Sequence, residues 1–446
     1  MSDLFVIGAS GTRAFRQAMA AISENIANAS TEGYSRRSVS TIESGSSTAV
    51  MTTYLSRANF GGTEVQGVNR ASDPYLDAAV RDTGMALTAS TARLRWMTDL
   101  EGALNDTETG VGKLMTGMYQ NMEKLAASPN DASLRVTTLD SIARVAEAFQ
   151  RTAADLSQVA DGIATESRSS VETINRSLSA LADINNSLLR APPGTSAYAQ
   201  LLDNRDAALN ALSSNLNVDI SFGAHDTAAV SFNGVTLVQG QNATGVALTV
   251  NANGSMALAT AGGAALAAPA SGTLGGLFSA ADTTVQRRAS LDSLAQQFVA
   301  GMNAWHAQGQ RVDNNAAGAP LLSYGGGAAA VTALITDPAA LATKSADGTL
   351  NGNLLSVATT LRGNGSAEQG WTSIIATQAN LLSSVKAEQT TAQGRSDQAI
   401  AAREAVSGVD LDMEAAELLR LQQAYSGSAK ILQIAKETVD AILQII

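Results

Sequence analysis

The chain lacks cysteine altogether and has only two histidines among its 446 residues. Without cysteine there can be no disulfide, no thiolate metal site and no cysteine nucleophile. Charged residues make up 15% of the chain, aromatic residues 4%, and the formal net charge is −11. An acidic chain without a basic patch argues against nucleic-acid binding, which depends on Lys and Arg at the phosphates. No run approaches the roughly 18 apolar residues of a membrane helix, and the first eight residues lack the basic flank of a signal peptide.

Residues that could carry chemistry are few and scattered. His225 and His306 lie far apart in sequence, and no His-Glu-x-x-His motif occurs, whereas a catalytic zinc takes three protein ligands. We interpret His306 as the polar end of an amphipathic helix. The carboxylates between 410 and 417 suit a helix N-terminus, and the arginine pairs 36–37 and 287–288 are interpreted as solvated. We therefore predict no enzyme, no cofactor and no metal site.

The start of the chain has the spacing of one helix face. Hydrophobic residues are 45% of the sequence, enough to argue against bulk disorder. Small or apolar residues recur at spacings of three, four and seven, which predicts an amphipathic helix. They are Leu4, Gly11, Phe15, Met19, Ile22, Ile26 and Ala29. Gly8 and Gly11 weaken that helix, because each costs about 1 kcal/mol relative to alanine.

The end of the chain has a stronger pattern, a seven-residue repeat that predicts a coiled-coil seam. Its first row is Leu411, Leu418, Tyr425, Leu432, Val439 and Ile446. A second row holds Leu421, Ala435 and Ile442, and Glu414 and Ser428 interrupt it. Helices of this length are marginal alone in water, so we expect the two ends to pair with each other. The pair could be the core of an ordinary globular domain or an interface ordered only in a polymer, and the pattern does not decide between these readings.

The middle of the chain is predicted to be a bundle of long antiparallel helices with a small β insertion. Helical patterns fill 72–215, with the longest between 142 and 188. Alternating segments from 218 to 258 flank Asn233-Gly234 and Asn253-Gly254, which are strong hairpin signals. A shorter β segment is expected between 39 and 69. Helix resumes near 273 and again at 371–406, and 309–370 is expected to be a loop, a length that is usually functional or poorly ordered.

Both ends resemble one family. The segment Ser23-Glu-Asn-Ile-Ala-Asn28, continuing to Gly33-Tyr34, resembles the N-terminal motif of flagellar rod, hook and hook-associated proteins. Ser407-Gly-Val-Asp-Leu-Asp-Met-Glu, with Leu421-Gln-Gln-Ala-Tyr425, resembles their C-terminal motif. In the middle, 201–212 and 302–309 resemble the branch of this family that forms the junction between hook and filament.

The resemblance implies an extracellular structural protein of the bacterial flagellum, exported unfolded through the flagellar type III apparatus and joining hook to filament. Implied partners are further copies in a ring-like axial assembly, the hook protein, a second junction protein, and a cytoplasmic export chaperone on the C-terminal helix, with Leu421, Ile431 and Leu432 as contacts. No nucleic acid and no membrane insertion are expected. The less favoured alternatives are a hook or distal-rod protein and, behind it, a secreted adhesin or host-interacting protein.

We expect three domains. Residues 1–38 with 407–446 form a coiled-coil assembly domain, 39–216 with 286–406 a helical bundle, and 217–285 a small outer β insertion. The terminal helices are expected to be disordered in the monomer and to fold on assembly. The predicted assembly interface consists of the residues named above at the two ends, from Leu4 to Tyr34, with Asn28 and Gly33 in the first motif, and from Leu411 to Ile446.

Overall fold

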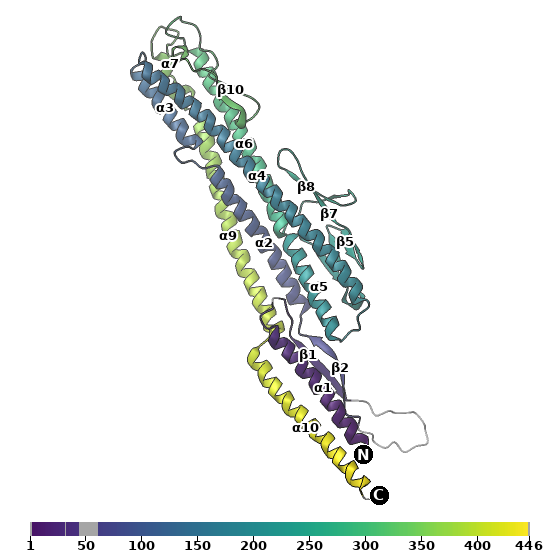
Figure 1. Cartoon of the computed structure of the whole chain (residues 1–446). Helices are drawn as coiled ribbons and strands as arrows, with labels where there is room; N and C mark the ends of the chain where they lie inside the picture. The colour runs from purple at the N-terminus through teal and green to yellow at the C-terminus, as the bar shows by residue number, and fades with distance from the viewer. Residues whose placement is uncertain (1, 32, 44–60, 445–446) are drawn as a thin grey trace. The chain divides into compact units, whose positions relative to one another are not determined.

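The computed structural model describes residues 2–31, 33–43 and 61–444 and divides into two compact units. Unit 1 comprises 1–85, 173–245 and 393–446, and unit 2 comprises 86–172 and 246–392. The division falls within three long helices, α2 (Pro74–Ala103), α4 (Ala132–Leu188) and α9 (Ala367–Ser407). The predicted fold class, mainly helical with small β elements, is confirmed (Figure 1). The three-domain division stays a prediction.

Unit 1 holds both ends of the described chain. Helices α1 (Ser2–Ala27) and α10 (Leu411–Leu443) pack side by side, and α5 (Ser196–Asn215) follows the turn after α4 (Figure 1). Strands β1 (Arg37–Glu43) and β2 (Thr63–Arg70) pair antiparallel, as expected between 39 and 69, although 44–60 lie outside the described residues. A second antiparallel sheet contains β3 (Asp219–Phe222), β4 (Ala228–Phe232), β5 (Val235–Gln239) and β6 (Asn242–Ala243).

The two predicted hairpins both form, with different turns. Asn233 and Gly234 join β4 to β5 directly, and both have positive φ, 47° and 80°, as a two-residue type I′ turn requires. The second hairpin, in unit 2, joins β7 (Val246–Val250) to β8 (Met256–Thr260) through a longer loop. There Gly254 has φ 92° but Asn253 does not share the left-handed conformation, because a five-residue loop does not need it.

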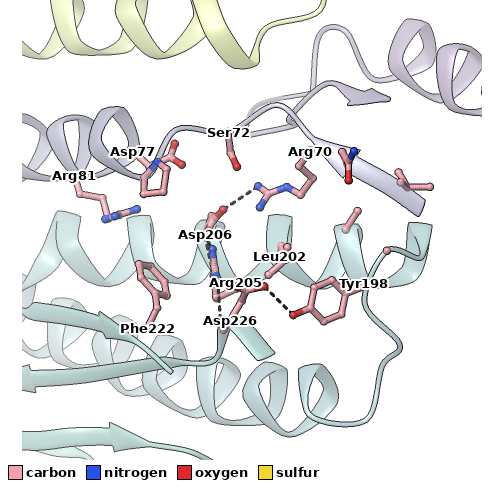
Figure 2. Close-up of a pocket in the computed structure, with 15 residues that line it drawn as sticks. Arg70, Ser72, Asp77, Arg81, Tyr198, Leu202, Arg205, Asp206, Phe222 and Asp226 are labelled. Carbon is pink, nitrogen blue, oxygen red and sulfur yellow. Dashed lines mark hydrogen bonds and ion pairs between the residues drawn. The ribbon is translucent and has the colours of Figure 1, made fainter. Parts of the chain in front are cut away.

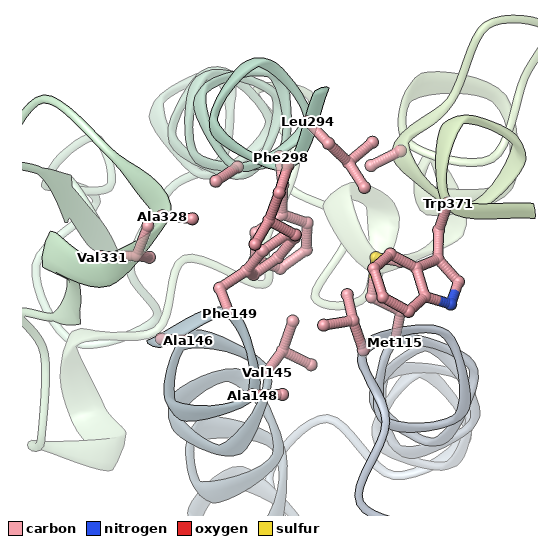
Figure 3. Packing of buried hydrophobic residues seen from close by; sticks show 14 of the residues in the cluster. Met115, Val145, Ala146, Ala148, Phe149, Leu294, Phe298, Ala328, Val331 and Trp371 are labelled. Carbon is pink, nitrogen blue, oxygen red and sulfur yellow. The ribbon is translucent and has the colours of Figure 1, made fainter. Parts of the chain in front are cut away.

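Unit 2 has one continuous apolar core. It packs α3 (Val111–Ala127) and α6 (Gly272–Gln308) against parts of α2, α4 and α9 within the unit. The rings of Phe149 and Phe298 lie 5.5 Å apart near the buried Trp371 and Met115 (Figure 3). Besides β7 and β8 the unit contains β9 (Ala265–Leu266), β10 (Leu322–Tyr324), β11 (Val331–Ala333), α7 (Gly352–Leu355) and α8 (Val357–Thr360).

The segment 309–370 is more structured than the sequence predicted, since it contains β10, β11, α7 and α8. Polar side chains of α4 and α6 organise its backbone. Arg135 donates to the carbonyls of Pro338 and Leu341, and Asn303 accepts from the backbone of Leu321 and Leu322. Hydrogen bonds of this kind leave no periodic apolar pattern, so the sequence read as a loop.

His306 belongs to the same system, and it lies in the last turn of α6, at the helix end that the sequence predicted. The ring is fully buried, its Nδ1 lies 2.5 Å from the oxygen of Ala319, and its Nε2 accepts from the N–H of Ala342 at 2.8 Å. With Nε2 as acceptor, Nδ1 carries the proton and the ring is neutral. Burial lowers the pKa of His306.

Candidate assembly interface

The terminal helices form an antiparallel pair with a defined register. Gly8 lies against Leu432, Gly11 against Ser428, and Asn25 bonds to Glu414, so one helix runs down as the other runs up (Figure 1). The buried residues of α10 recur every seven residues, at Glu414, Leu421, Ser428 and Ala435. The row facing α1 is thus the one that two polar residues had been expected to interrupt.

Both glycines of α1 sit where the helices approach most closely. A Cβ at Gly8 would lie 2.7 Å from Cγ of Leu432 and 3.2 Å from the carbonyl oxygen of Ser428. A Cβ at Gly11 would lie 2.7 Å from Oγ of Ser428. The helix-propensity cost of about 1 kcal/mol per glycine is therefore offset by close packing. The sequence showed the cost but not its structural reason.

Asn25 is the polar centre of the pair, and its side chain is fully buried. Its Nδ2 donates to the carbonyl oxygen of Arg37 at 2.8 Å and to Oε2 of Glu414 at 3.0 Å. Its Oδ1 accepts from the hydroxyl of Tyr34 at 2.8 Å and from the N–H of Arg37 at 2.9 Å. Burial raises the pKa of Tyr34 to about 12, so the hydroxyl stays protonated as a donor. One side chain thereby ties α1, the segment after it and the start of α10 together.

Charges of alternating sign continue from this centre to α5, within unit 1. The buried guanidinium of Arg37 pairs with Glu24 at 2.5 Å and with Asp203 at 2.7 Å. Arg70 then pairs with Asp203 and Asp206, both at 2.8 Å. The prediction that the arginine pairs 36–37 and 287–288 are solvated was wrong for Arg37 and Arg287, which are buried. Breaking one of these buried ion pairs would leave an uncompensated charge, which favours the arrangement in which all of them form.

One side of the α1–α10 pair stays open. On α10 this side carries Leu411, Leu418 and Tyr425, each of which lies three residues before a buried residue. The equivalent stripe on α1 consists of Phe15, Met19 and Ile26. We call these six residues the open face. Because the helices run antiparallel, equivalent flanks lie on one side of the pair. The opposite flank of α1 is occupied, since Thr63 of β2 donates from its N–H to Oγ of Ser10.

The open face is apolar and accessible. Leu411 is 52% exposed and Tyr425 and Ile26 are each 37% exposed, whereas Phe15, Met19 and Leu418 are half-buried. The register places Phe15 level with Tyr425, so the two stripes form one surface. Apolar side chains left at this level of exposure gain from burial against another surface, by about 1.5–3 kcal/mol for each fully buried leucine-sized group.

The other predicted interface residues occupy several environments. Ile22, Leu421 and Ala435 are buried within the pair. Leu432 and Val439 are half-buried, and Leu4 and Ile442 are exposed. Asn28 donates to the carbonyl of Glu24, and Gly33 has φ 79° in the turn before Tyr34. Ile446 lies outside the described residues.

Sequence reasoning missed Asn25, Arg37 and Glu414 as site residues. Asn25 lies seven and fourteen residues after the small Ala18 and Gly11, on the face that packs against α10. A polar residue at such a position signals a buried hydrogen-bonding centre that sets register. The partners Arg37 and Asp203 leave no comparable signal, because only the tertiary fold brings them together.

Within residues 2–31, 33–43 and 61–444, no three His, Asp or Glu side chains gather in a way that could hold a metal ion. No helix in the described part of the chain combines the length and the apolar character needed to cross a membrane.

Comparison with known families gives matches along most of the chain. Residues 97–322 match the family model described as the flagellar hook-associated protein FlgK helical domain. Residues 5–34 match a flagella basal body rod protein model, and 404–445 match the flagellar basal body rod FlgEFG protein C-terminal model. The two end models cover most of α1, the turn after it, and α10. These elements build the pair described above.

The chain is similar to flagellar relatives from several bacteria and to a solved structure. It is 23% identical to flagellar hook-associated protein 1 of Bacillus subtilis, over 99% of this chain and 98% of the relative. It is 25% identical to the protein of that name from Salmonella typhimurium, over 71% of this chain and 58% of the relative. The flagellar hook junction protein FlgK from Burkholderia pseudomallei shares its fold, with 23% identity, a TM-score of 0.50, and coverage of 56% of this chain and 46% of that one.

Proposed function

Because the chain belongs to the flagellar hook-associated protein FlgK family, we propose that it joins hook to filament by polymerising through its paired terminal helices after unfolded export. The family consists of structural proteins of the flagellum and not of enzymes, which confirms the prediction of a non-enzymatic role. The match to the FlgK helical domain supports the junction over a rod or hook position, since the rod models match only the two ends.

The observation that carries the proposal is the open face. The α1–α10 pair buries one row of each helix and leaves a second, apolar row accessible along its length. A neighbouring copy would cover that row, so that each open face packs against the next pair around the axis. Polymerisation then uses hydrophobic surface that a single chain has no means to bury.

Folding of the pair is weakly favoured in one chain. Of the four residues that α10 buries, Glu414 and Ser428 are polar and Ala435 is small, so Leu421 alone buries a large apolar side chain. Ordering backbone costs about 1–2 kcal/mol per residue, which so small a core offsets poorly. The terminal helices would stay unfolded during export and fold once neighbouring copies supply the missing surface.

The partners follow from this arrangement. Residues 1–38 with 407–446 would act as the assembly domain, contacting further copies, the hook protein on one side and a second junction protein on the other. Before export, a cytoplasmic chaperone would hold the C-terminal helix at Leu421, Ile431 and Leu432. Leu421 is buried in the pair, so such a chaperone would have to bind before the pair forms, and the protein would leave through the flagellar type III apparatus.

The interface is tested with single charges on α10. Leu418→Asp and Leu432→Asp should each abolish incorporation into flagella while the rest of the chain stays folded, because a carboxylate at either position would lose its water on assembly. Gln423→Asp introduces the same charge at an exposed position of α10 and should incorporate normally. Incorporation is measured on isolated flagella from a complemented deletion strain. Normal incorporation of both leucine variants would contradict the proposal that α10 forms the assembly interface.

The unfolded-until-assembled part has a separate test, hydrogen exchange on the purified monomer. The proposal expects fast exchange across α10 and slow exchange across α4 and α6. Slow exchange throughout α10 in the monomer would instead favour an ordinary core pair that is complete within one chain.

A further inference from the structure

A cavity of about 620 Å³ lies within unit 1, between the start of α2, α5 and the strands β2 and β3. Figure 2 shows its charged side chains gathered around Asp206. Leu202 and Phe222 give part of the wall an apolar character. None of the interface residues predicted from the sequence lines this cavity.

Most of its charged groups already have partners. Asp206 accepts from Arg205 through Oδ1 and pairs with Arg70 through Oδ2 at 2.8 Å. Arg205 also donates to the carbonyl oxygen of Asp226 at 2.7 Å, and the carboxylate of Asp226 accepts from the hydroxyl of Tyr198 at 2.8 Å. These groups form a closed set in which both oxygens of Asp206 are in use.

Arg81 is different. Its side chain lines the cavity and is only 8% exposed, yet among the described residues it has no ion pair within 4.0 Å and no hydrogen bond. Asp77, one turn earlier on α2, faces the same cavity without an ion pair among those residues (Figure 2). Burial lowers the pKa of Arg81, and Asp206 and Asp77 oppose that effect from a distance. A guanidinium buried to this extent normally has an oxyanion in contact with its fork of donors.

We propose that this cavity binds a carboxylate through Arg81, with an apolar group of the same molecule against Leu202 and Phe222. Arginine suits the role because its planar donors match two carboxylate oxygens. Asp77 and Asp206 disfavour a multiply charged anion, so a single carboxylate fits best. The carboxylate could come from a free small organic acid or from an acidic side chain of a second copy, which the net charge of −11 makes abundant.

The test uses the purified full chain and a matched pair of probes, benzoate and the neutral benzamide, at constant ionic strength. Ligand-observed NMR should show binding of benzoate and none of benzamide. Arg81→Gln should weaken benzoate binding at least tenfold, and Arg81→Lys, which keeps the charge, should weaken it less. Arg16→Gln, at an exposed position of α1, should leave binding unchanged.

A second measurement separates the two sources. If a side chain of another copy is the occupant, benzoate will not bind detectably. In that case Arg81→Gln will reduce incorporation into flagella several-fold while Arg81→Lys retains it. The proposal is overturned if benzoate does not bind and Arg81→Gln incorporates normally, or if Arg81→Gln binds benzoate as tightly as the wild type does. The benzoate measurement does not depend on the open face, because none of the six open-face residues lines the cavity. Failure of the assembly proposal and failure of this one can therefore be told apart.

Discussion

His306 allows the packing of unit 2 to be tested by pH. Its ring is fully buried and neutral, with Nε2 accepting from the N–H of Ala342. Protonation of Nε2 would place two N–H donors, that of His306 and that of Ala342, against each other. It would also put a positive charge in a buried site, where the nearby positive charge of Arg311 disfavours it further. The folded protein therefore takes up this proton at lower pH than the unfolded chain does.

The sign and size of the effect follow from linkage. Burial lowers the pKa of His306 in the folded state from its ordinary value of 6.5, so its stabilising contribution is complete above that pH. The contribution is lost as pH falls from 6.5 towards the folded-state pKa, by up to about 1.4 kcal/mol per pH unit. Between pH 7.5 and 5.0 unit 2 should lose about 2 kcal/mol if the folded ring stays neutral throughout.

Tryptophan fluorescence during urea unfolding is the assay, because Trp96, Trp305 and Trp371 are all buried in unit 2. His306→Gln should lower the free energy of unfolding at pH 7.5 by about 2–4 kcal/mol, since backbone groups lose buried partners, and should abolish the loss between pH 7.5 and 5.0. His225, the other histidine, is exposed, so His225→Gln should keep the pH dependence of the wild type. A wild type whose unfolding free energy is constant over this range would refute the reasoning.

Two further predictions concern the α1–α10 pair. Gly8→Leu should abolish incorporation into flagella, because its Cβ alone would lie 2.7 Å from Cγ of Leu432. Gly427→Leu should incorporate normally, because a Cβ at that position has no atom within 4 Å. Equal incorporation of the two variants would contradict the close approach of the helices at Gly8. Asn25→Ala should destabilise the assembled pair by about 3 kcal/mol or more, since it leaves the buried backbone N–H and C=O of Arg37 without their partner and removes a bond from the buried carboxylate of Glu414. In cells that also express the wild type, it should be depleted at least tenfold in flagella. Asn28→Ala, which removes only bonds to nearby residues of its own segment, should be depleted little, and similar depletion of both variants would argue against a special role for Asn25.

The helices were predictable because their signals are periodic. The seven-residue spacing predicted α10, and Asp410 caps it by accepting from the N–H groups of Asp412 and Met413. Asn233-Gly234 predicted its hairpin because the turn needs residues that tolerate positive φ. These features depend on neighbours in sequence, and one sequence is enough to show them.

The partners in the polar centre around Asn25 could not be predicted in this way, because they are distant from one another in sequence. Asn25 bonds to Glu414, and Arg37 pairs with Asp203, and neither pairing has a spacing rule. The row of α10 that packs against α1 could not be predicted for the same reason. Glu414 and Ser428 looked like interruptions, but Asn25 satisfies the carboxylate and Gly11 leaves room beside the serine. A polar interruption in a seam can therefore mark the buried row when its partners come from elsewhere.

The central claim, that the chain joins hook to filament, is tested most directly by electron microscopy of cells lacking its gene, together with an assay for flagellin in the medium. The proposal predicts hooks of normal length without filaments and free flagellin outside the cells. Missing hooks would move the protein inward to the rod or hook, and normal filaments would contradict the claim outright.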